Sequence, residues 1–418
     1  MDEKNCHDIS ECAMTLRSKK DGTIRRTSLL ITINACMFVF GIVLLLMGSL
    51  LPTLKFGDAR SGSLGSFPLV GILVATALVG PVLDKVGAKI ALGVALVLIA
   101  SALAAIPSLG SYAAMAVAAL VYGLGAGVLN AATNTLVSGL SASGRGAALN
   151  LLGFSFSLGA LAVPLLMSLT RGRFSSATVL YILAATSAAI LVSVLMQKFP
   201  APTQASTPLG SLLKVLRDPL VWLFGALLFF ESCNENCMFV WAGKVAQELL
   251  HTSAQRAELV LLGLSASLGA GRLFAVLWLK WIGDRNTVLL SAGITIAGAI
   301  TVLSSATFPG VATGFCVIGF GLSAIFPTIL GMAGDRFPRE TGTVFGAIIT
   351  VGLVGGVAGP VLGSWAATFN PARVLAVPLV AATGVAALAW IVSSRKHAIT
   401  ASTSAIDSNP SGRPGDVP

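Results

Sequence analysis

Charged residues are scarce in this sequence: they make up 11% of the 418 residues, against 55% for hydrophobic residues. A soluble domain usually contains about 25% charged residues, because charge has to cover its surface in water. The mean hydropathy is +0.88. So little charge excludes an ordinary soluble enzyme, a disordered protein and a nucleic-acid-binding protein.

Cysteine and histidine are also few. The six cysteines are spread along the chain without C-x-x-C spacing, and His7, His251 and His397 lie in predicted loops or tails. This pattern predicts neither a disulfide framework nor a zinc site. No phosphate loop, catalytic triad or metal-ligand cluster appears, so we expect no enzyme activity, no metal and no cofactor.

Apolar runs of about 20 residues dominate the chain instead. Each is long enough for a helix to cross a hydrocarbon core of about 30 Å. Transmembrane strands would need alternating segments of about ten residues, which are not seen. We therefore predict an all-α membrane protein with twelve transmembrane helices. The predicted spans are 29–51, 65–83, 90–108, 112–136, 147–169, 177–197, 220–243, 258–279, 286–306, 310–333, 343–368 and 374–394.

The positive charges are distributed unevenly between the loops. Of the 27 Lys and Arg residues, one lies within a span; with a cytoplasmic N-terminus, nineteen fall on the cytoplasmic side and seven on the opposite side. Cytoplasmic loops carry an excess of Lys and Arg. The excess of basic residues is thus a topology signal, and it predicts a multi-pass cell-membrane protein, in a bacterial inner membrane, with both termini cytoplasmic.

Polar segments divide the chain into two six-helix halves. Residues 1–28 form a predicted cytoplasmic tail, followed by a bundle over 29–197. Residues 198–219 are rich in Pro, Ser and Thr and form a predicted cytoplasmic linker. A second bundle over 220–394 precedes a tail, 395–418, whose Ser/Pro/Gly/Asp-rich composition predicts disorder.

The two halves resemble each other at a constant offset of 196 residues. Several glycines and one proline recur at equivalent places in the predicted spans, which indicates duplication. Transporters built from parallel six-helix repeats bind their solute between the halves, near the midplane. The matching pairs are Gly87 and Gly283, Gly123 and Gly319, Gly125 and Gly321, Gly146 and Gly342, Gly159 and Gly355, and Pro164 and Pro360.

The loop after the second predicted span reads GPVLDKVGAK, from Gly80 to Lys89. Gly80 permits close helix approach and Gly87 a tight turn, Asp84 accepts hydrogen bonds near a helix end, and Lys85 and Lys89 anchor the inner face. This loop resembles the G-x-x-x-D-(R/K)-x-G-x-(R/K) signature of the major facilitator superfamily. The resemblance implies the major facilitator fold and alternating access. The second half keeps Gly283 but has Lys280 in place of the Asp.

Four further stretches resemble the fucose/glucose/galactose–proton symporter family. The stretch RGAALNLLGFSFSLGALAVPLL matches an L-N-L-x-x-x-F-x-x-G pattern, and the seventh span has a Glu followed six residues later by a Trp. The eighth span has a Gly-Arg-(Leu/Phe) match and the tenth an F-P-T match. The matching residues are Asn134, Asn150, Phe154 or Phe156, Gly159, Pro164, Glu235, Trp241, Gly271, Arg272, Leu273, Phe326, Pro327 and Thr328.

One departure from that family concerns the coupling ion. Proton-coupled members use carboxylates in the first and fourth spans, where this chain has Asn34 and Asn130 and no Asp or Glu. A proton carrier at those positions is therefore not transferred by the resemblance. Coupling lies elsewhere in the chain, or is absent.

Only three ionisable residues lie deep in the predicted spans: Glu231, Glu235 and Arg272. A rise of about 1.5 Å per residue puts them roughly 16, 22 and 12 Å from the cytoplasmic face. Charged residues inside membranes are costly and usually functional. One interpretation is that a carboxylate takes up a proton or sodium ion and competes with Arg272. The other is a static ion pair between adjacent helices.

Amide side chains form the second candidate constellation. Asn130 and Asn134 share a face of the fourth span with small residues, and amides recognise sugar hydroxyls without charge. The alternative is hydrogen bonding between helices, which small residues also favour. The predicted solute-binding residues are Asn34, Asn130, Asn134, Asn150, Asn234 and Trp241.

Together these features predict a secondary transporter of a monosaccharide or a similar small polar solute, by symport with a proton or sodium ion. The predicted partners are the solute, the ion and the lipid bilayer, with no nucleic acid, and the chain is expected to act as a monomer. One alternative is an exporter of drugs or metabolites. Another is a proton-coupled carrier of an organic anion that binds Arg272.

Overall fold

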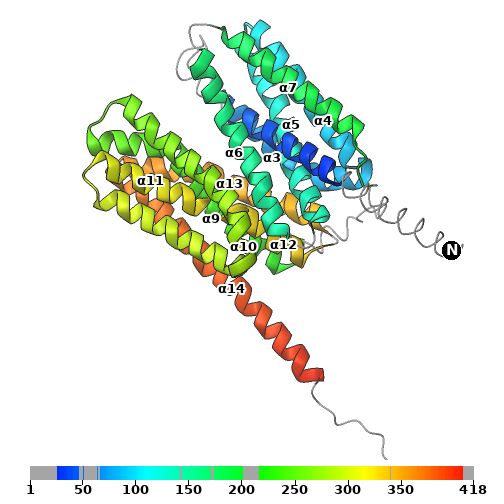
Figure 1. Cartoon of the computed structure of the whole chain (residues 1–418), viewed down its shortest axis with the longest axis vertical. Helices are drawn as coiled ribbons and strands as arrows, with labels where there is room; N and C mark the ends of the chain where they lie inside the picture. Colours follow the sequence, from blue (N-terminus) through cyan, green and yellow to red (C-terminus); the bar gives the residue numbers. More distant parts are fainter. Residues whose placement is uncertain are drawn as a thin grey trace, which may run out of the picture. The chain divides into compact units, whose positions relative to one another are not determined.

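The structure is a computed structural model that describes residues 26–46, 50, 64, 66–141, 144–170, 174–200, 216–338 and 340–407. Most of the predicted N-terminal tail and linker, and residues 408–418, lie outside these ranges. Every regular element in the described ranges is a helix (Figure 1). The chain divides into two compact units.

The first unit contains residues 1–217, together with Arg272–Val276 and Leu330–Thr350. In it, α3 packs against α5, and α4 lies between α5 and α7 (Figure 1). Its helices are Arg26–Leu46, α3 (Ser66–Val86), α4 (Ala88–Ala105), the 3₁₀ turn η2 (Ile106–Ser108), α5 (Tyr112–Leu140), α6 (Arg145–Thr170) and α7 (Ser176–Met196).

The second unit contains Asp218–Gly271, Leu277–Ile329 and 351–418. In it, α9 packs against α14 and α11. Its elements, some of which contribute residues to the first unit, are α9 (Pro219–Leu250), α10 (Ala254–Ser304), α11 (Phe308–Leu322), α12 (Ile325–Arg336), α13 (Thr341–Ala367), η3 (Pro371–Leu375) and α14 (Ala376–Asp407).

These helices correspond to the twelve predicted spans; their ends differ by several residues, and three differences are larger. The eighth and ninth spans join in α10 through the non-helical residue Gly283. The tenth span is divided into α11 and α12, since Pro327 has no N–H to continue the helix. The last span continues as α14 to Asp407, so residues 395–407, predicted as disordered, are helical here.

The internal repeat is visible in the helix contacts. A Cβ atom added at Gly123 would collide with the Pro68 carbonyl, and one at the equivalent Gly319 with the Leu264 carbonyl. Gly87 and Gly283 share one backbone conformation, with φ and ψ of 79° and 159° in the first and 74° and 168° in the second. The halves are therefore copies of one six-helix fold.

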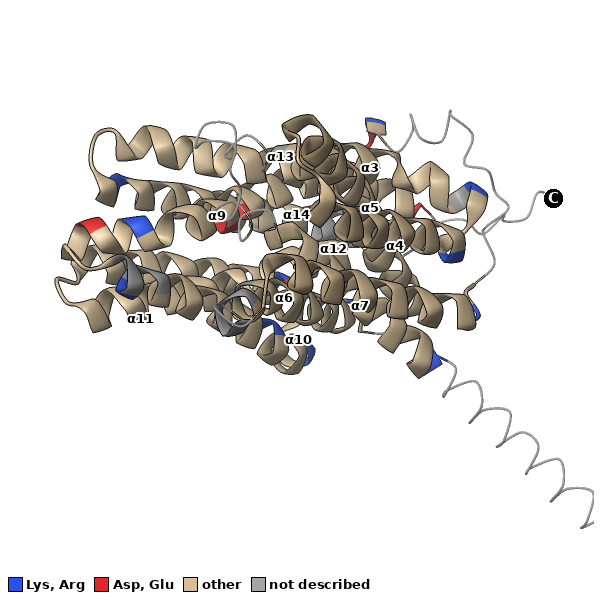
Figure 2. Ribbon diagram, turned by 90° about the horizontal axis from the view of Figure 1, so that it is seen from above, with Lys and Arg blue, Asp and Glu red and all other residues tan. Residues whose placement is uncertain are grey.

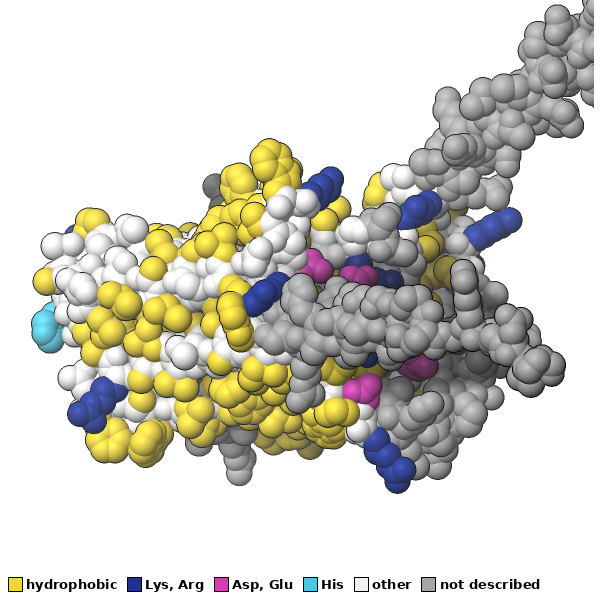
Figure 3. Space-filling model, turned by 90° about the horizontal axis from the view of Figure 1, so that it is seen from below, with side chains coloured by type: hydrophobic (Ala, Val, Ile, Leu, Met, Phe, Trp, Pro, Cys, Tyr) yellow, Lys and Arg dark blue, Asp and Glu magenta, His cyan; other side chains and the backbone are white. Residues whose placement is uncertain are grey.

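Many apolar side chains are exposed on the described helices, and Figure 3 shows them on one face. Nine of the described helices are long and apolar enough to cross a membrane, and large side chains such as Trp281, Val361 and Leu277 are exposed. Contiguous exposed apolar surface on this scale indicates contact with another apolar phase. The described helices thus have the surface of a bilayer-spanning protein.

Candidate functional site

Helix α9 carries a band of buried polar residues near its middle. Asp218 caps the helix by accepting a hydrogen bond from the Leu220 N–H at 2.8 Å, and Pro219 occupies the first position. Figure 2 shows acidic positions partway along α9, where Glu231 is fully buried and Glu235 partly buried. Ser232 Oγ donates to Glu231 Oε2 at 3.0 Å. The two carboxyl groups are therefore held away from the helix ends.

Asn234 lies in the same band and has no hydrogen-bond partner among the described residues. Its side chain is 1% exposed, and neither Oδ1 nor Nδ2 is paired. Burying an unpaired amide costs about 1–3 kcal/mol. Such a group in a native structure requires an explanation, and a ligand or water that binds there is one.

Glycines of α13 face this part of α9. A Cβ atom at Gly352 would lie 3.4 Å from Ser232 Oγ, and one at Gly356 would lie 3.0 Å from Asn236 Nδ2. Small residues let helices approach closely in membranes. Trp241, predicted to bind solute, donates from Nε1 to the Pro360 carbonyl of α13 at 3.1 Å. Its indole N–H therefore has a partner within the second unit.

Thr328 is a buried polar residue of the second unit that sequence reasoning did not select as a site residue. It lies on α12 after Pro327, is 0% exposed, and its Oγ1 has no partner among the described residues. The F-P-T match contained it, but the sequence did not indicate its burial. Asn234 and Thr328 are thus both buried in the second unit with side-chain polar atoms that have no partner among the described residues.

The amides of the first unit differ from one another in how their hydrogen bonds are used. Asn134 Nδ2 donates to the Asn130 carbonyl at 2.8 Å and to Asn130 Oδ1 at 3.1 Å. Asn150 Nδ2 donates to the Gly146 carbonyl, whereas its Oδ1 is buried and unpaired. Asn34 accepts from Ser155 Oγ and donates to the Leu30 carbonyl, each at 2.8 Å. Asn34 therefore links the first helix to α6.

Arg272 belongs to the first unit, where it lies against α6. Its side chain is 4% exposed, and Nη1 donates to the Gly153 carbonyl at 3.0 Å and to Ser157 Oγ at 2.9 Å. Its guanidinium carbon lies 5.3 Å from the centre of the Phe156 ring. A Cβ atom at Gly153 would approach Arg272 Cδ to 3.1 Å, so this glycine makes room for the arginine. Pairing of Arg272 with Glu231, which belongs to the second unit, stays a prediction.

The sequence matches the family model of the Major Facilitator Superfamily over residues 29–360 and 236–410. The chain belongs to this superfamily. It is 26% identical over 327 residues to an uncharacterized MFS-type transporter of Yersinia pestis, covering 75% of this chain and 83% of that protein. It is also 29% identical over 114 residues to YttB, an uncharacterized MFS-type transporter of Bacillus subtilis (strain 168), covering 27% of this chain and 29% of YttB.

Solved structures confirm the major facilitator fold. The fucose:proton symporter FucP of E. coli has a TM-score of 0.76 at 18% identity, covering 88% of this chain and 99% of FucP. The proton:xylose symporter XylE has a TM-score of 0.75 at 14% identity, covering 88% of this chain and 96% of XylE. The human organic anion transporter MFSD10 has a TM-score of 0.68 at 17% identity, covering 88% of this chain and 98% of MFSD10. At these identities the likeness establishes the fold.

The superfamily signature loop has the local structure that its residues predict. Gly87 has φ 79°, and a Cβ atom at Gly80 would lie 3.2 Å from Thr343 Cα of α13. Lys89 Nζ donates to the carbonyls of Leu195 at 2.6 Å and Gln197 at 3.1 Å, at the C-terminal end of α7. Lys85 is exposed, and the side chain of Asp84 lies outside the described part of the chain.

An ion pair within the first unit was not among the predicted site residues. Arg145 Nη1 contacts Asp335 Oδ1 at 2.6 Å, and Arg145 Nε donates to the Ser138 carbonyl at 2.9 Å. Arg145 begins α6 and Asp335 lies near the end of α12. Both residues are charged and lie at the ends of predicted spans, but only the folded chain identifies them as partners.

Metal binding has no support in the described ranges, where no group of three or more His, Cys, Asp or Glu side chains could hold an ion. Cys233 and Cys237 are buried free thiols on α9. The buried polar groups of the described residues are amides, hydroxyls and guanidinium groups in the first unit, and an amide, hydroxyls and a carboxylate in the second.

Proposed function

We propose that this MFS transporter carries a monosaccharide or a similarly small polar solute by alternating access, in symport with a proton or a sodium ion. It acts as a monomer in a bacterial inner membrane with both termini in the cytoplasm. The observation that carries the proposal is the buried, unpaired amide of Asn234 beside the buried Glu231. A solute hydroxyl both donates and accepts, and can satisfy both atoms of an amide.

The remaining solute contacts are assigned to Asn130, Asn134 and Asn150. The first two pair with each other and leave part of their hydrogen-bonding capacity for a ligand, since each amide has two donors and an acceptor with two lone pairs. Asn150 Oδ1 is buried and unpaired. Asn34 and Trp241 have a supporting role, because their polar atoms bond to neighbouring helices.

Cation coupling is assigned to Glu231 or Glu235. A carboxylate in a low-dielectric interior can take up and release a proton, or bind sodium through its oxygens, as coupling requires. Glu231 is fully buried and receives a hydrogen bond from Ser232. Both fold neighbours named as sugar:proton symporters, FucP and XylE, support the same class of transport.

The test uses the purified full chain in proteoliposomes with labelled hexoses. We expect counterflow of at least one hexose, and accumulation when a proton or sodium gradient is imposed. Glu231→Gln or Glu235→Gln should retain counterflow and lose gradient-driven accumulation. If no hexose shows counterflow, the proposed solute class is wrong. If accumulation does not depend on the proton gradient or on the sodium gradient, the proposed coupling is wrong.

A second candidate is a carrier of organic anions, in either direction. The buried guanidinium of Arg272, held by Gly153 and Ser157, favours it, and MFSD10 provides a fold neighbour named as an organic anion transporter. Arg272→Gln separates the two candidates. It should abolish uptake by an anion carrier, but leave hexose counterflow measurable in a sugar symporter.

A further inference from the structure

The second copy of the signature loop has two basic residues, as the first has, but it lacks the Asp at the signature position and contains tryptophan. At the offset of 196, Lys280 replaces Asp84, Trp281 replaces Lys85, and Gly283 is retained in the same backbone conformation as Gly87. The turn at Gly283 thus keeps the backbone conformation of the first copy, whereas the side chains around it differ. This combination indicates that the second loop has a different role. The solute contacts and the coupling residues proposed above do not include this loop.

The basic residue after the turn also differs between the copies. In the first, Lys89 is bonded to two carbonyls at the end of α7. In the second, the equivalent Arg285 places its guanidinium carbon 4.3 Å from the centre of the Trp390 ring of α14. Arg285 Nε has no hydrogen-bond partner among the described residues. Nε is itself buried, so what the stack fixes is the plane of the guanidinium, whose charge lies beside an exposed ring.

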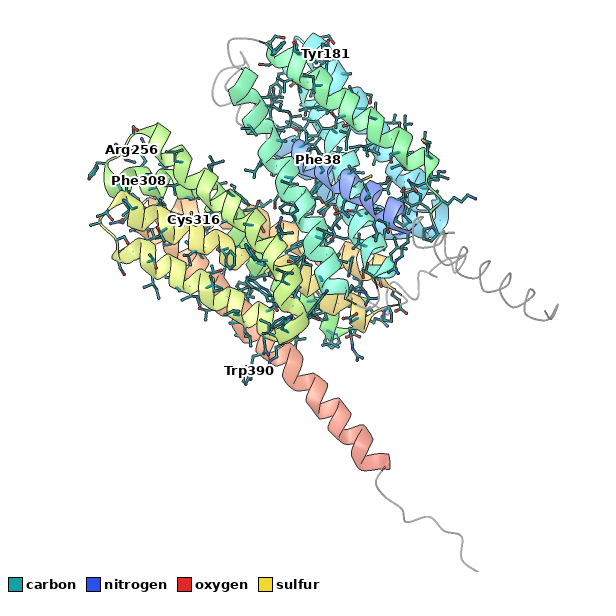
Figure 4. All side chains as sticks on the ribbon, viewed as in Figure 1. Phe38, Tyr181, Arg256, Phe308, Cys316 and Trp390 are labelled. Carbon is teal, nitrogen blue, oxygen red and sulfur yellow. The ribbon has the colours of Figure 1, made fainter. Side chains whose placement is uncertain are left out.

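Aromatic side chains flank this cation and are exposed. Trp281 is 88% exposed and Trp390 is 59% exposed, and Lys280 is also exposed. Tryptophan is enriched at membrane–water interfaces, where its ring lies at the headgroup level. Figure 4 shows Trp390 at the opposite end of the second unit from Arg256 and Phe308. The loop thus lies at one end of the bundle, and the charge distribution predicts that this end is cytoplasmic.

Two more basic residues follow on α14. Arg395 and Lys396 lie five and six residues after Trp390 in the same helix, which is a rise of about 8 Å. Asp284 is the acidic residue of the loop, and it already has an interaction within the protein. Four basic residues against one acidic residue give this stretch of α10 and α14 a net positive formal charge.

We propose that Lys280 and Arg285, together with Trp281 and Trp390, form a binding site for the headgroup of an anionic phospholipid. Arg285 binds a phosphate oxygen while Trp390 fixes its plane, Lys280 adds a second charge, and Trp281 lies among the headgroups. Basic clusters beside transmembrane helices bind anionic headgroups in this way, with each Lys or Arg strengthening binding about fivefold. The site is separate from the solute and coupling residues.

The experiment measures binding of cardiolipin to the purified full chain by native mass spectrometry, with phosphatidylcholine as the neutral lipid. We expect Arg285→Gln and Lys280→Gln each to weaken cardiolipin binding about fivefold, and phosphatidylcholine binding to stay unchanged. Arg256→Gln is the matched control at the other end of the unit, and it should bind cardiolipin like the wild type. Arg285→Lys keeps the charge but not the planar stack on Trp390, so it should weaken cardiolipin binding less than Arg285→Gln does.

Three outcomes overturn the proposal. If the Lys280→Gln, Arg285→Gln double variant binds cardiolipin as well as the wild type, these residues do not form the site. If Arg256→Gln weakens cardiolipin binding as much as Arg285→Gln does, the lipid is attracted by the overall positive charge and not by a specific site. Inorganic phosphate that binds as tightly as cardiolipin assigns the site to a soluble anion. Melting temperatures in phosphatidylcholine confirm that each variant is folded, and Trp281→Ala provides a second test on an exposed side chain.

Discussion

At the scale of single residues, the structure separates amides that hold helices together from a buried amide that has no hydrogen-bond partner among the described residues. Asn34 uses both side-chain atoms in helix contacts, whereas Asn234 uses neither among the described residues. The sequence placed both in the same class, because an Asn in an apolar run looks the same whether or not it is paired. The distinction depends on neighbours that are remote along the chain.

This difference predicts opposite behaviour of two leucine substitutions. Asn34→Leu should lower the free energy of unfolding by about 0.5–1.5 kcal/mol, because it removes the hydrogen bond from Ser155 that joins the first helix to α6. Asn234→Leu should be close to neutral for stability, since it removes an unpaired buried amide, but should abolish solute counterflow. Thermal melting in detergent and counterflow in proteoliposomes measure the two effects. A fully active Asn234→Leu would contradict a solute-binding role.

Glycines at helix crossings give a second prediction at this scale. A Cβ atom at Gly159 would meet the Phe38 carbonyl, and one at the repeat-related Gly355 would meet the Phe229 carbonyl. Backbone atoms cannot move aside as a flexible side chain can, so alanine at either position should cost about 1–3 kcal/mol. Gly293 has nothing within 4 Å of its added Cβ, and Gly293→Ala should be neutral or stabilising by up to about 1 kcal/mol. Melting temperatures that fall equally in all three would refute this explanation.

At the scale of elements, the turns at Gly87 and Gly283 connect consecutive helices in each half. Their φ and ψ values of 79° and 159°, and 74° and 168°, fall in a region that is essentially restricted to glycine. Alanine at either position should cost about 1–3 kcal/mol. Asparagine should not restore stability, because it tolerates the left-handed helical region and not this one. Gly139→Ala in α5, whose added Cβ meets nothing within 4 Å, is the control for chemical unfolding.

Element boundaries were predictable where one residue type decides them. Helix α9 begins at Pro219, one residue before the predicted span 220–243, and the signature loop turns at Gly87. The interruption between α11 and α12 was not predicted, because the apolar run 310–333 continues through it without a change of composition. Pro327 removes the N–H that would bond to the Ser323 carbonyl, and the ring of a proline also clashes with the preceding turn. A hydropathy pattern alone does not contain this effect.

At the scale of the whole molecule, the sequence was sufficient for the class of fold and insufficient for the contacts of the site. Run lengths predict helices, and the recurrence of glycines at one offset predicts the duplication, because both are local properties of the chain. The contacts of Arg272 with α6 and of Arg145 with Asp335 join residues 119 and 190 positions apart. Such contacts depend on how the helices pack, which no spacing rule encodes.

The distribution of Lys and Arg between the loops predicts the orientation of the whole chain in the membrane. Nineteen Lys and Arg residues fall in predicted cytoplasmic segments and seven in the opposite ones; such an imbalance orients membrane proteins during insertion. Alkaline phosphatase folds only outside the cytoplasm, so a fusion after His251, between α9 and α10, should be active. Fusions after Gly283 or after residue 407 should be inactive, while a fluorescent protein at the same two points should be bright. The reverse pattern would contradict the topology, and it would also move the proposed lipid site to the other leaflet.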